Sequence, residues 1–262
     1  MVRKVSFIAL ILFVTGIIGT IFTINTQMKQ AAKLEEKIVG TNAFNNITVD
    51  TKNGEITLLP TNDEKVKVEL AGNDSRYELN TTVKNDTLNI YVKSEWNKIF
   101  SFDLFSKPLS LTVYIPEKEY DTIQVKSNNG QIHLTDIEGR EIAVDTNNGK
   151  IGLENVVATL VKAETDNGSI RMENISGEIV GETNNGKIFI ITEVLNWPLE
   201  LHTDNGKIDV QSKNKPDNVI FDLQTHNGRV SVFGERDWET VIGNGDNLIK
   251  LTTKNGSITI EN

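Results

Sequence analysis

A six-residue motif that recurs through the chain constrains its fold more than any other sequence feature. The motif reads Thr/Ser-x-Asn-Gly-x-Ile/Val, and its Asn-Gly pairs are Asn53 and Gly54, Asn129 and Gly130, Asn148 and Gly149, Asn167 and Gly168, Asn185 and Gly186, Asn205 and Gly206, Asn227 and Gly228, and Asn255 and Gly256. From the second copy onward, successive glycines lie 18 to 28 residues apart. A recurring period of this size is the signature of a repeat architecture.

Apolar residues alternate on both sides of the motif, as in Ile123 and Val125 before the second copy and Ile132 and Leu134 after it. This period of two indicates β-strands with one buried face. Glycine accepts a positive φ angle without steric cost, and asparagine tolerates the left-handed region better than most residues. Each Asn-Gly pair therefore predicts a tight turn between strands, and the motif threonine can hydrogen-bond a neighbour.

Two all-β architectures fit this pattern. Asn-Gly between alternating strands is a strong hairpin signal, so an antiparallel hairpin meander is the alternative. The near-constant period favours a parallel β-solenoid, or β-helix-like domain, because a solenoid stacks equivalent positions whereas a meander needs no fixed spacing. In a solenoid, Asn148, Asn167, Asn185 and Asn205 would stack about 4.8 Å apart as an amide ladder.

The repeat pattern divides the exported part of the chain into two regions. Residues 121–262 carry most copies of the motif and are predicted to form the solenoid. Residues 41–120 contain strand-like runs without the regular period, so we expect an irregular β-region that caps the start of the stack, since terminal repeats are usually atypical. Residues 96–105 are rich in Phe and Trp, and we expect them to cover the first coils.

The N-terminal segment predicts a single membrane span. Residues 5–24 carry no charge and are long enough to cross about 30 Å of hydrocarbon as a helix. Arg3 and Lys4 precede them, which places the amino terminus in the cytoplasm and the bulk of the chain outside it. A cleaved signal peptide is the alternative, although its apolar core would be shorter and would end in a small-x-small site. We therefore expect a cytoplasmic tip and transmembrane signal anchor over residues 1–24 and a stalk over residues 25–40.

Composition excludes several classes of protein. The chain contains no cysteine, which excludes disulfides, thiolate metal sites and thiol nucleophiles. Its formal net charge is −9, which argues against nucleic acid as a partner because the phosphate backbone requires a basic surface.

The polar residues do not form a recognisable catalytic or metal-binding motif. His133, His202 and His226 are not in a metal-ligand spacing. Asp166 and Asp204 share a motif position but would lie about 10 Å apart on alternate coils, too far to hold one calcium ion. The sequence therefore predicts no catalytic residues, no metal and no cofactor.

One charged row is a candidate binding site. The residue after the motif glycine is Lys187, Lys207 and Arg229 in three consecutive copies, and stacking would align them on successive coils. Such a stripe could bind an anionic cell-wall polymer. The alternative is an ordinary solvated face, because Asp145, Glu164 and Glu182 precede the motif threonines and would neutralise part of the charge.

The segment from Leu111 to Leu134, LTVYIPEKEYDTIQVKSNNGQIHL, resembles the LiaG-type putative adhesin domain of bacteria. The resemblance depends on the strand end at Tyr114 to Pro116 together with the repeated turn motif, and it covers roughly residues 41–262. It implies a bacterial protein held by one N-terminal span, an envelope-stress context in Gram-positive bacteria, and no catalytic residue to carry over.

These observations predict a membrane-anchored, extracytoplasmic binding or interaction module of the cell envelope that is not an enzyme. Its expected partners are the membrane and either a cell-wall polymer or another envelope protein. A structural or signalling spacer that docks another membrane protein is the first alternative, and a carbohydrate-active enzyme is the second, since such enzymes also use parallel β-helices.

Overall fold

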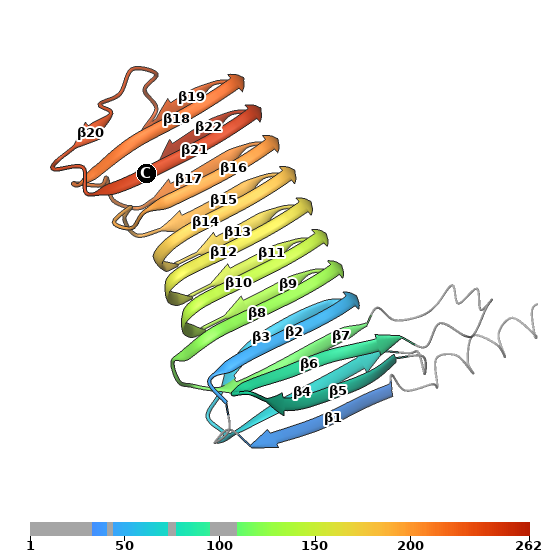
Figure 1. Cartoon of the computed structure of the whole chain (residues 1–262). Helices are drawn as coiled ribbons and strands as arrows, with labels where there is room; N and C mark the ends of the chain where they lie inside the picture. The colour runs from blue at the N-terminus through green and yellow to red at the C-terminus, as the bar shows by residue number, and fades with distance from the viewer. Residues whose placement is uncertain (1–32, 41–43, 73–76, 95–108) are drawn as a thin grey trace, which may run out of the picture.

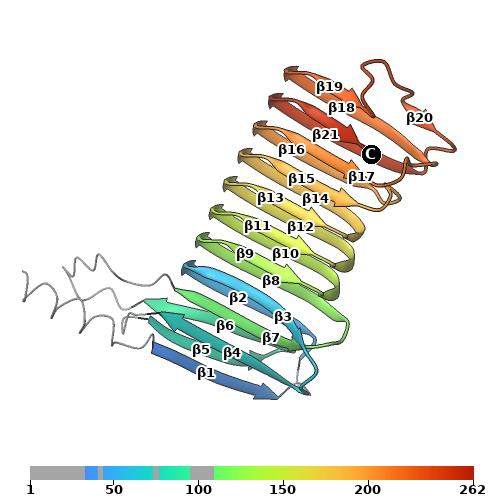
Figure 2. The same cartoon turned by 180° about the vertical axis from the view of Figure 1, so that it is seen from behind.

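The computed structural model describes residues 33–40, 44–72, 77–94 and 109–262. The predicted span at residues 5–24 and the aromatic segment at residues 96–105 lie outside the described residues. No helix within the described ranges is long and apolar enough to cross a bilayer. The described chain forms two 11-stranded sheets packed face to face, which confirms the all-β prediction. Figures 1 and 2 show them as a ladder of coils that runs from β1 (Lys33–Gly40) at one end to β20 (Val241–Ile242) at the other.

Each repeat forms one coil, made of one longer strand and one shorter strand. The longer strands lie in one sheet, which we call sheet B, and the shorter strands lie in the other, which we call sheet A. The Asn-Gly motif joins the two strands of a coil, and a second turn leads to the next coil. The sheet B strands of the regular coils are β8 (Tyr120–Asn129), β10 (Glu138–Asn148), β12 (Val157–Asn167), β14 (Ser176–Asn185) and β16 (Leu199–Asn205). The sheet A strands are β9 (Ile132–Thr135), β11 (Ile151–Glu154), β13 (Ile170–Glu173), β15 (Ile188–Thr192) and β17 (Ile208–Ser212).

Equivalent residues of neighbouring coils pair in parallel, as Asn148 does with Asn167 and Ile151 with Ile170. The parallel solenoid is therefore confirmed, and the hairpin meander is wrong for the repeats. A hairpin does occur outside them, where Asn85 and Asp86, both with positive φ, join β5 (Tyr77–Lys84) to β6 (Thr87–Ser94). The Asn-Gly motif instead turns the chain from one sheet into the other.

The core lies between the two sheets and follows from the alternation in the sequence. In β10, for example, Ile142, Val144 and Thr146 are buried, and Ala143 and Asp145 between them face outward. Ile151 continues the same inward-facing row after the turn. Burying a side chain of this size contributes roughly 1.5–3 kcal/mol, and each coil repeats the contribution.

The N-terminal end of the stack does not follow chain order. The first motif lies between β2 (Asn46–Asn53) and β3 (Glu55–Thr61), and this coil stacks directly on β8 and β9, far away in sequence. Strands β6 and β7 (Ser110–Pro116), which come between β3 and β8 in the chain, pair with β2 and β3 on the outer side of this coil. Antiparallel strands β4 (Lys65–Gly72) and β5 then close this end.

Residues 33–40, which the sequence pattern assigned to a stalk, instead form the edge strand β1, paired antiparallel with β4 over eight residue pairs. An edge strand is held by backbone hydrogen bonds and needs no second buried face. This explains why Ile38 remains 61% exposed and why alternation did not predict the strand.

The C-terminal end is also reordered. The last coil, β21 (Asn247–Asn255) and β22 (Ile258–Glu261), inserts between β16/β17 and the preceding coil, β18 (Val219–Asn227) and β19 (Val230–Val232). The penultimate repeat is therefore the terminal coil of the stack. The short strand β20 pairs antiparallel with β18 at this end.

Candidate functional site

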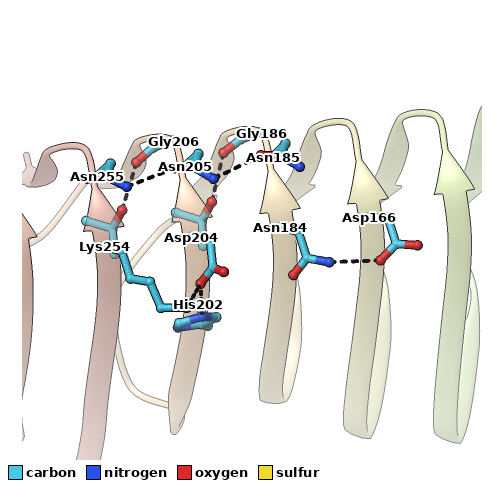
Figure 3. A network of polar contacts seen from close by, with 12 residues as sticks. Asp166, Asn184, Asn185, Gly186, His202, Asp204, Asn205, Gly206, Lys254 and Asn255 are labelled. Carbon is cyan, nitrogen blue, oxygen red and sulfur yellow. Dashed lines mark hydrogen bonds and ion pairs between the residues drawn. The ribbon is translucent and has the colours of Figure 1, made fainter.

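The stack has two long edges, and the first is built by the Asn-Gly turns. The motif asparagines form the predicted amide ladder, in which each side-chain Nδ2 donates to the Oδ1 of the asparagine on the neighbouring coil. The distance is 2.9 Å from Asn148 to Asn129 and 3.0 Å from Asn167 to Asn148. Figure 3 shows the same row at Asn185, Asn205 and Asn255. These bonds satisfy amide groups that would otherwise compete for backbone partners.

The motif glycines are required for close approach more than for a positive φ angle. Only Gly54 among them has a φ in the left-handed region, at 109°. A Cβ atom on Gly168 would lie 1.6 Å from the carbonyl oxygen of Gly149, and the other motif glycines except Gly54 meet the carbonyl oxygen of a neighbouring motif glycine in the same way. The predicted tight turns are present, but at the motif glycines other than Gly54 the neighbouring coil, and not a positive φ, excludes a side chain.

Most motif threonines are buried, and several of them donate to the glycine carbonyls of the same row. Thr203 Oγ1 donates to Gly186 O at 3.1 Å, and Thr253 Oγ1 donates to Gly206 O at 3.0 Å. Together with the asparagines and glycines, these hydroxyl groups build a network of backbone and side-chain hydrogen bonds along the Asn-Gly edge, although the buried Thr146 hydroxyl has no partner among the described residues. A network of this kind stiffens the edge and fixes the register of successive coils.

The variable motif position carries a second, exposed set of contacts. Asn184 Nδ2 donates to Asp166 Oδ1 at 2.9 Å, and Asp204 Oδ1 accepts from Lys254 Nζ at 2.7 Å and contacts His202 Nε2 at 3.0 Å (Figure 3). The hydrogen bonds from Lys254 and His202 lower the pKa of Asp204. Lys254 thus neutralises Asp204 within the edge, whereas Asp166 accepts only an uncharged amide hydrogen bond.

The predicted basic stripe is interrupted in the structure. Lys187 and Lys207 precede the paired strands β15 and β17 and lie on neighbouring coils, but the inserted last coil places Ser257 between Lys207 and Arg229. The prediction that all three occupy successive coils is therefore wrong, because stacking order differs from chain order. The whole Asn-Gly edge nevertheless has an excess of positive charge. Its cations are Lys52, Lys150, Lys187, Lys207, Lys254 and Arg229, and its anions are Glu55, Asp166 and Asp204.

The acidic row expected to neutralise the stripe lies on the outer face of sheet B. The parallel register of β10, β12 and β14 places three acidic residues side by side on neighbouring strands: Asp145, Glu164 and Glu182. Lys126 on β8 approaches Asp145 at 3.7 Å, but no ion pair joins the acidic row to Lys187 or Lys207. This row belongs to the sheet face and not to the Asn-Gly edge.

The three histidines are separated in the structure. His133 is on the outer face of sheet A, His202 is on that of sheet B, and His226 is exposed on the terminal coil. Groups of three or more His, Asp or Glu side chains that could hold a metal are absent from the described residues.

The second long edge, formed by the turns that lead into the next coil, carries a feature that the sequence reading missed. Asp136, Asn155 and Asn174 all adopt a positive φ, at 55°, 52° and 54°, in the conformation that Asn and Asp tolerate. Their side chains form another ladder, with Asn155 Nδ2 donating to Asp136 Oδ1 at 2.8 Å and Asn174 Nδ2 to Asn155 Oδ1 at 3.1 Å. The signal was present as an Asp or Asn followed by Ile or Val at a spacing of 19 residues.

A groove runs along this second-turn edge. We call it the turn groove and define it by Pro60, Pro116, Glu138, Val157, Glu178 and Trp197. It consists of two hollows of about 370 and 500 Å³, which share Glu138 and Val157. At one end Tyr120 is buried, its hydroxyl donates to Pro116 O at 3.1 Å, and burial raises its pKa. At the other end the longer connection between β15 and β16 carries Trp197.

The fold and its two edges define a two-sheet parallel β-solenoid in which every coil exposes one Asn-Gly turn and one second turn. The chain belongs to the Toastrack DUF4097 family, whose model matches residues 44–261. The family match covers nearly the same residues, roughly 41–262, as the resemblance that the segment from Leu111 to Leu134 indicated.

Several solved structures are similar to this chain at low sequence identity. A putative cell adhesion protein from Clostridium sporogenes ATCC 15579 is 14% identical with a TM-score of 0.42, over 88% of this chain and 99% of that chain. A putative adhesin from Bacteroides fragilis NCTC 9343 is 14% identical with a TM-score of 0.49, over 88% of this chain and 98% of that chain. A putative lipid binding protein from Parabacteroides distasonis ATCC 8503 is 12% identical with a TM-score of 0.49, over 89% of this chain and 98% of that chain. Among curated proteins, none matches the sequence.

Proposed function

We propose that this protein is a non-enzymatic binding module of the bacterial cell envelope, held outside the cytoplasm by one N-terminal membrane span. The observation that carries the proposal is the regular stack itself. Parallel pairing in constant register, with a hydrogen-bonded ladder on each edge, displays rows of equivalent side chains on a rigid support. Rigid repetitive surfaces of this kind are used for extended contacts with partners.

The membrane anchor is supported by the uncharged run at residues 5–24 and by Arg3 and Lys4 before it. Strand β1 begins at Lys33, only a few residues after that run, so the N-terminal end of the stack would lie close to the membrane surface. This arrangement suits a protein that meets partners at or near the membrane. The resemblance to LiaG-type proteins extends the proposal to a role in envelope stress.

Two kinds of partner follow from the charges. The Asn-Gly edge, with its excess of cations, would suit an anionic wall polymer, although Ser257 interrupts the predicted stripe. The second-turn edge has the opposite character, because Glu117, Glu138 and Glu178 line an apolar groove there. A polypeptide partner in the envelope is therefore the favoured candidate, and a wall polymer is the second.

The test is a binding experiment with the full chain in detergent micelles. The immobilised protein is presented with isolated anionic wall polymers and, separately, with detergent-solubilised membrane proteins from a Gram-positive bacterium, at several salt concentrations. We expect reproducible retention of one membrane protein, and urea-unfolded chain on the same support is the control. If only a wall polymer is retained, and its retention is sensitive to salt, the partner is the polymer and not a polypeptide. Retention of neither, or turnover of a glycan, would overturn the proposal.

A further inference from the structure

We propose that the turn groove binds an extended segment of a partner polypeptide in which basic and apolar side chains alternate. This inference depends on the proposed binding function, and it names the class of partner and the surface that receives it. It follows from the apolar lining, the charges and the length of the groove.

The apolar lining is exposed where most of the molecule buries such residues. Val157 is 50% exposed and Trp197 is 43% exposed, and both line the larger hollow. A tryptophan and a β-branched side chain exposed together in a concave surface are unusual for a solvated turn, and such patches mark interaction sites.

Two glycines form part of the lining of the larger hollow. Gly177, with φ at 118°, lines it, and a Cβ atom at this position would lie 1.8 Å from the carbonyl oxygen of Ala158. Gly139, which also lines the hollow, has a Cβ position 3.2 Å from the carbonyl oxygen of Tyr120. At these two positions the lining is backbone packed closely against the neighbouring coil, where a larger residue would not fit.

Carboxylates without a cationic partner line the groove. Among the described residues, no lysine, arginine or histidine lies within ion-pair distance of Glu117, Glu138 or Glu178, which are all exposed. Uncompensated carboxylates beside an apolar lining favour a partner that supplies both positive charge and apolar surface.

Two cations lie at the groove: Lys118 lines the smaller hollow and is bound only by uncharged groups, and Arg140 is paired with carboxylates outside the three named above. Lys118 donates its ammonium to Phe44 O at 2.9 Å and to Asn45 Oδ1 at 3.2 Å, and it lies 4.8 Å from the centroid of the Tyr120 ring. Arg140 pairs with Glu119 at 3.5 Å and with Asp121 at 3.4 Å. Lys118 places one positive charge in the smaller hollow against the carboxylates of Glu117, Asp136 and Glu138, so the groove keeps a net negative charge.

The backbone of this edge is not available for strand addition. The turn N–H groups donate to the next or preceding coil, as Asn155 N does to Glu173 O at 2.9 Å and Val157 N does to Ile137 O at 3.0 Å. Recognition must therefore use side chains, which is why we infer alternation in the ligand: apolar side chains face the floor while basic ones reach the carboxylates.

The dimensions fit a short extended segment. The groove runs from the end of β7, past β3, β9, β11 and β13, to the connection after β15. These are five strand spacings, on the order of 24 Å at about 4.8 Å each, which an extended chain of about seven residues would span at about 3.3 Å per residue.

The experiment measures binding of a rhodamine-labelled octapeptide of alternating lysine and leucine to the full chain in maltoside micelles, by fluorescence anisotropy. Micelles without protein give the baseline, and an alternating glutamate–leucine peptide and an alternating lysine–serine peptide test charge and apolar surface separately. The double variant Glu138→Gln/Glu178→Gln removes two groove carboxylates. The matched control, Glu164→Gln/Glu182→Gln, removes the same charge from the exposed face of sheet B.

We expect salt-sensitive binding of the lysine–leucine peptide and much weaker binding of the other two peptides. The groove variant should raise the dissociation constant about tenfold, since two exposed ion pairs are lost, while the control variant changes it less than about twofold. Trp197→Ala should also weaken binding, and Trp197→Phe should retain most of it.

If the groove and control variants lose the same affinity for the lysine–leucine peptide, net charge alone attracts the peptide, and the groove is not its binding site. The chain could instead self-associate in a concentration-dependent way that the variant Glu138→Gln/Glu178→Gln abolishes. The occupant of the groove would then be a second copy of the chain, and the proposal of a partner polypeptide would be overturned. The proposed binding function is tested separately from the groove. If wild type and the groove variant retain a membrane protein equally, the binding function stands and only the assignment of the groove as its site is refuted.

Discussion

The close stacking of the motif glycines makes a sharp prediction for Gly168→Ala. The added Cβ atom would lie 1.6 Å from the carbonyl oxygen of Gly149 and 2.7 Å from its carbonyl carbon. Both are backbone atoms of the neighbouring coil, so no side-chain rotation can relieve the overlap. The coils must separate locally by more than 1 Å to reach an ordinary contact of about 3.4 Å.

Such a separation would weaken the hydrogen bonds that join these two coils at the turn. They are Gly149 N to Asn167 O at 3.2 Å, Ile151 N to Ser169 O at 2.9 Å, and Asn167 Nδ2 to Asn148 Oδ1 at 3.0 Å. At about 1 kcal/mol each, their loss predicts a decrease of about 3 kcal/mol in the free energy of unfolding.

The matched control is Gly152→Ala on β11, in the neighbouring coil that carries Gly149. Its Cβ atom would approach the ring of His133, which is a half-exposed side chain that can rotate away. We therefore expect a change of less than about 0.5 kcal/mol, as for an ordinary surface substitution. Urea unfolding of the full chain in detergent, followed by the β-sheet signal in far-ultraviolet circular dichroism, measures both variants. If both unfold within about 0.5 kcal/mol of each other, close approach is not the reason for glycine in the motif.

Three further predictions concern the ladder, the core and one ion pair. Asn167→Asp replaces the amide donor of the ladder with a carboxylate, and we expect urea unfolding at neutral pH to show a loss of about 1–3 kcal/mol; an unchanged midpoint would mean that the ladder adds no stability. Ile170→Ala empties a fully buried position and should cost about 2–5 kcal/mol, whereas Val157→Ala, at a position that is 50% exposed, should change stability by less than about 0.5 kcal/mol; equal losses would contradict the placement of the core. The Lys254 hydrogen bond lowers the pKa of Asp204 from 3.8, so its stabilisation is present above about pH 4 and is lost as the pH falls through the lower folded pKa. The difference in unfolding midpoint between wild type and Asp204→Asn should therefore shrink below about pH 4, and a difference that stays constant from pH 7 to pH 3 would contradict this assignment.

The interior of the stack was predictable from the sequence because its determinants are local and repeated. The alternation of Ile142 and Val144 sets the buried face of β10, and the equal spacing of Asn148 and Asn167 sets the parallel register. The amide ladder followed from that register alone. Each repeat meets the same surroundings, so one pattern describes all of the regular coils.

The two ends were not predictable in the same way. Strand β1 pairs through its backbone at the sheet edge and leaves Ile38 exposed, so its side chains carry little signal. The insertion of β21 and β22 between β16/β17 and β18/β19 depends on which coil best covers the exposed end of the stack. All of these coils carry the same motif, and a shared motif cannot specify their order.

The turn groove shows the same limit at a candidate site. Asp136, Asn155 and Asn174 were visible as a spaced pattern, but the hollow between the coils needs Pro60, Pro116 and Trp197 as well. These residues come from connections of different lengths, and only the stack brings them to one edge.

The sequence by itself determined the class of fold, the size of the coil, the inward-facing residues and the chemistry of the Asn-Gly turn, because alternation and repetition act over a few residues. The tertiary structure alone decided the order of the terminal coils, the true role of the motif glycines and the existence of an acidic groove. Those properties depend on backbone atoms of a neighbouring coil, about 4.8 Å away in space and some 20 residues or more away along the chain.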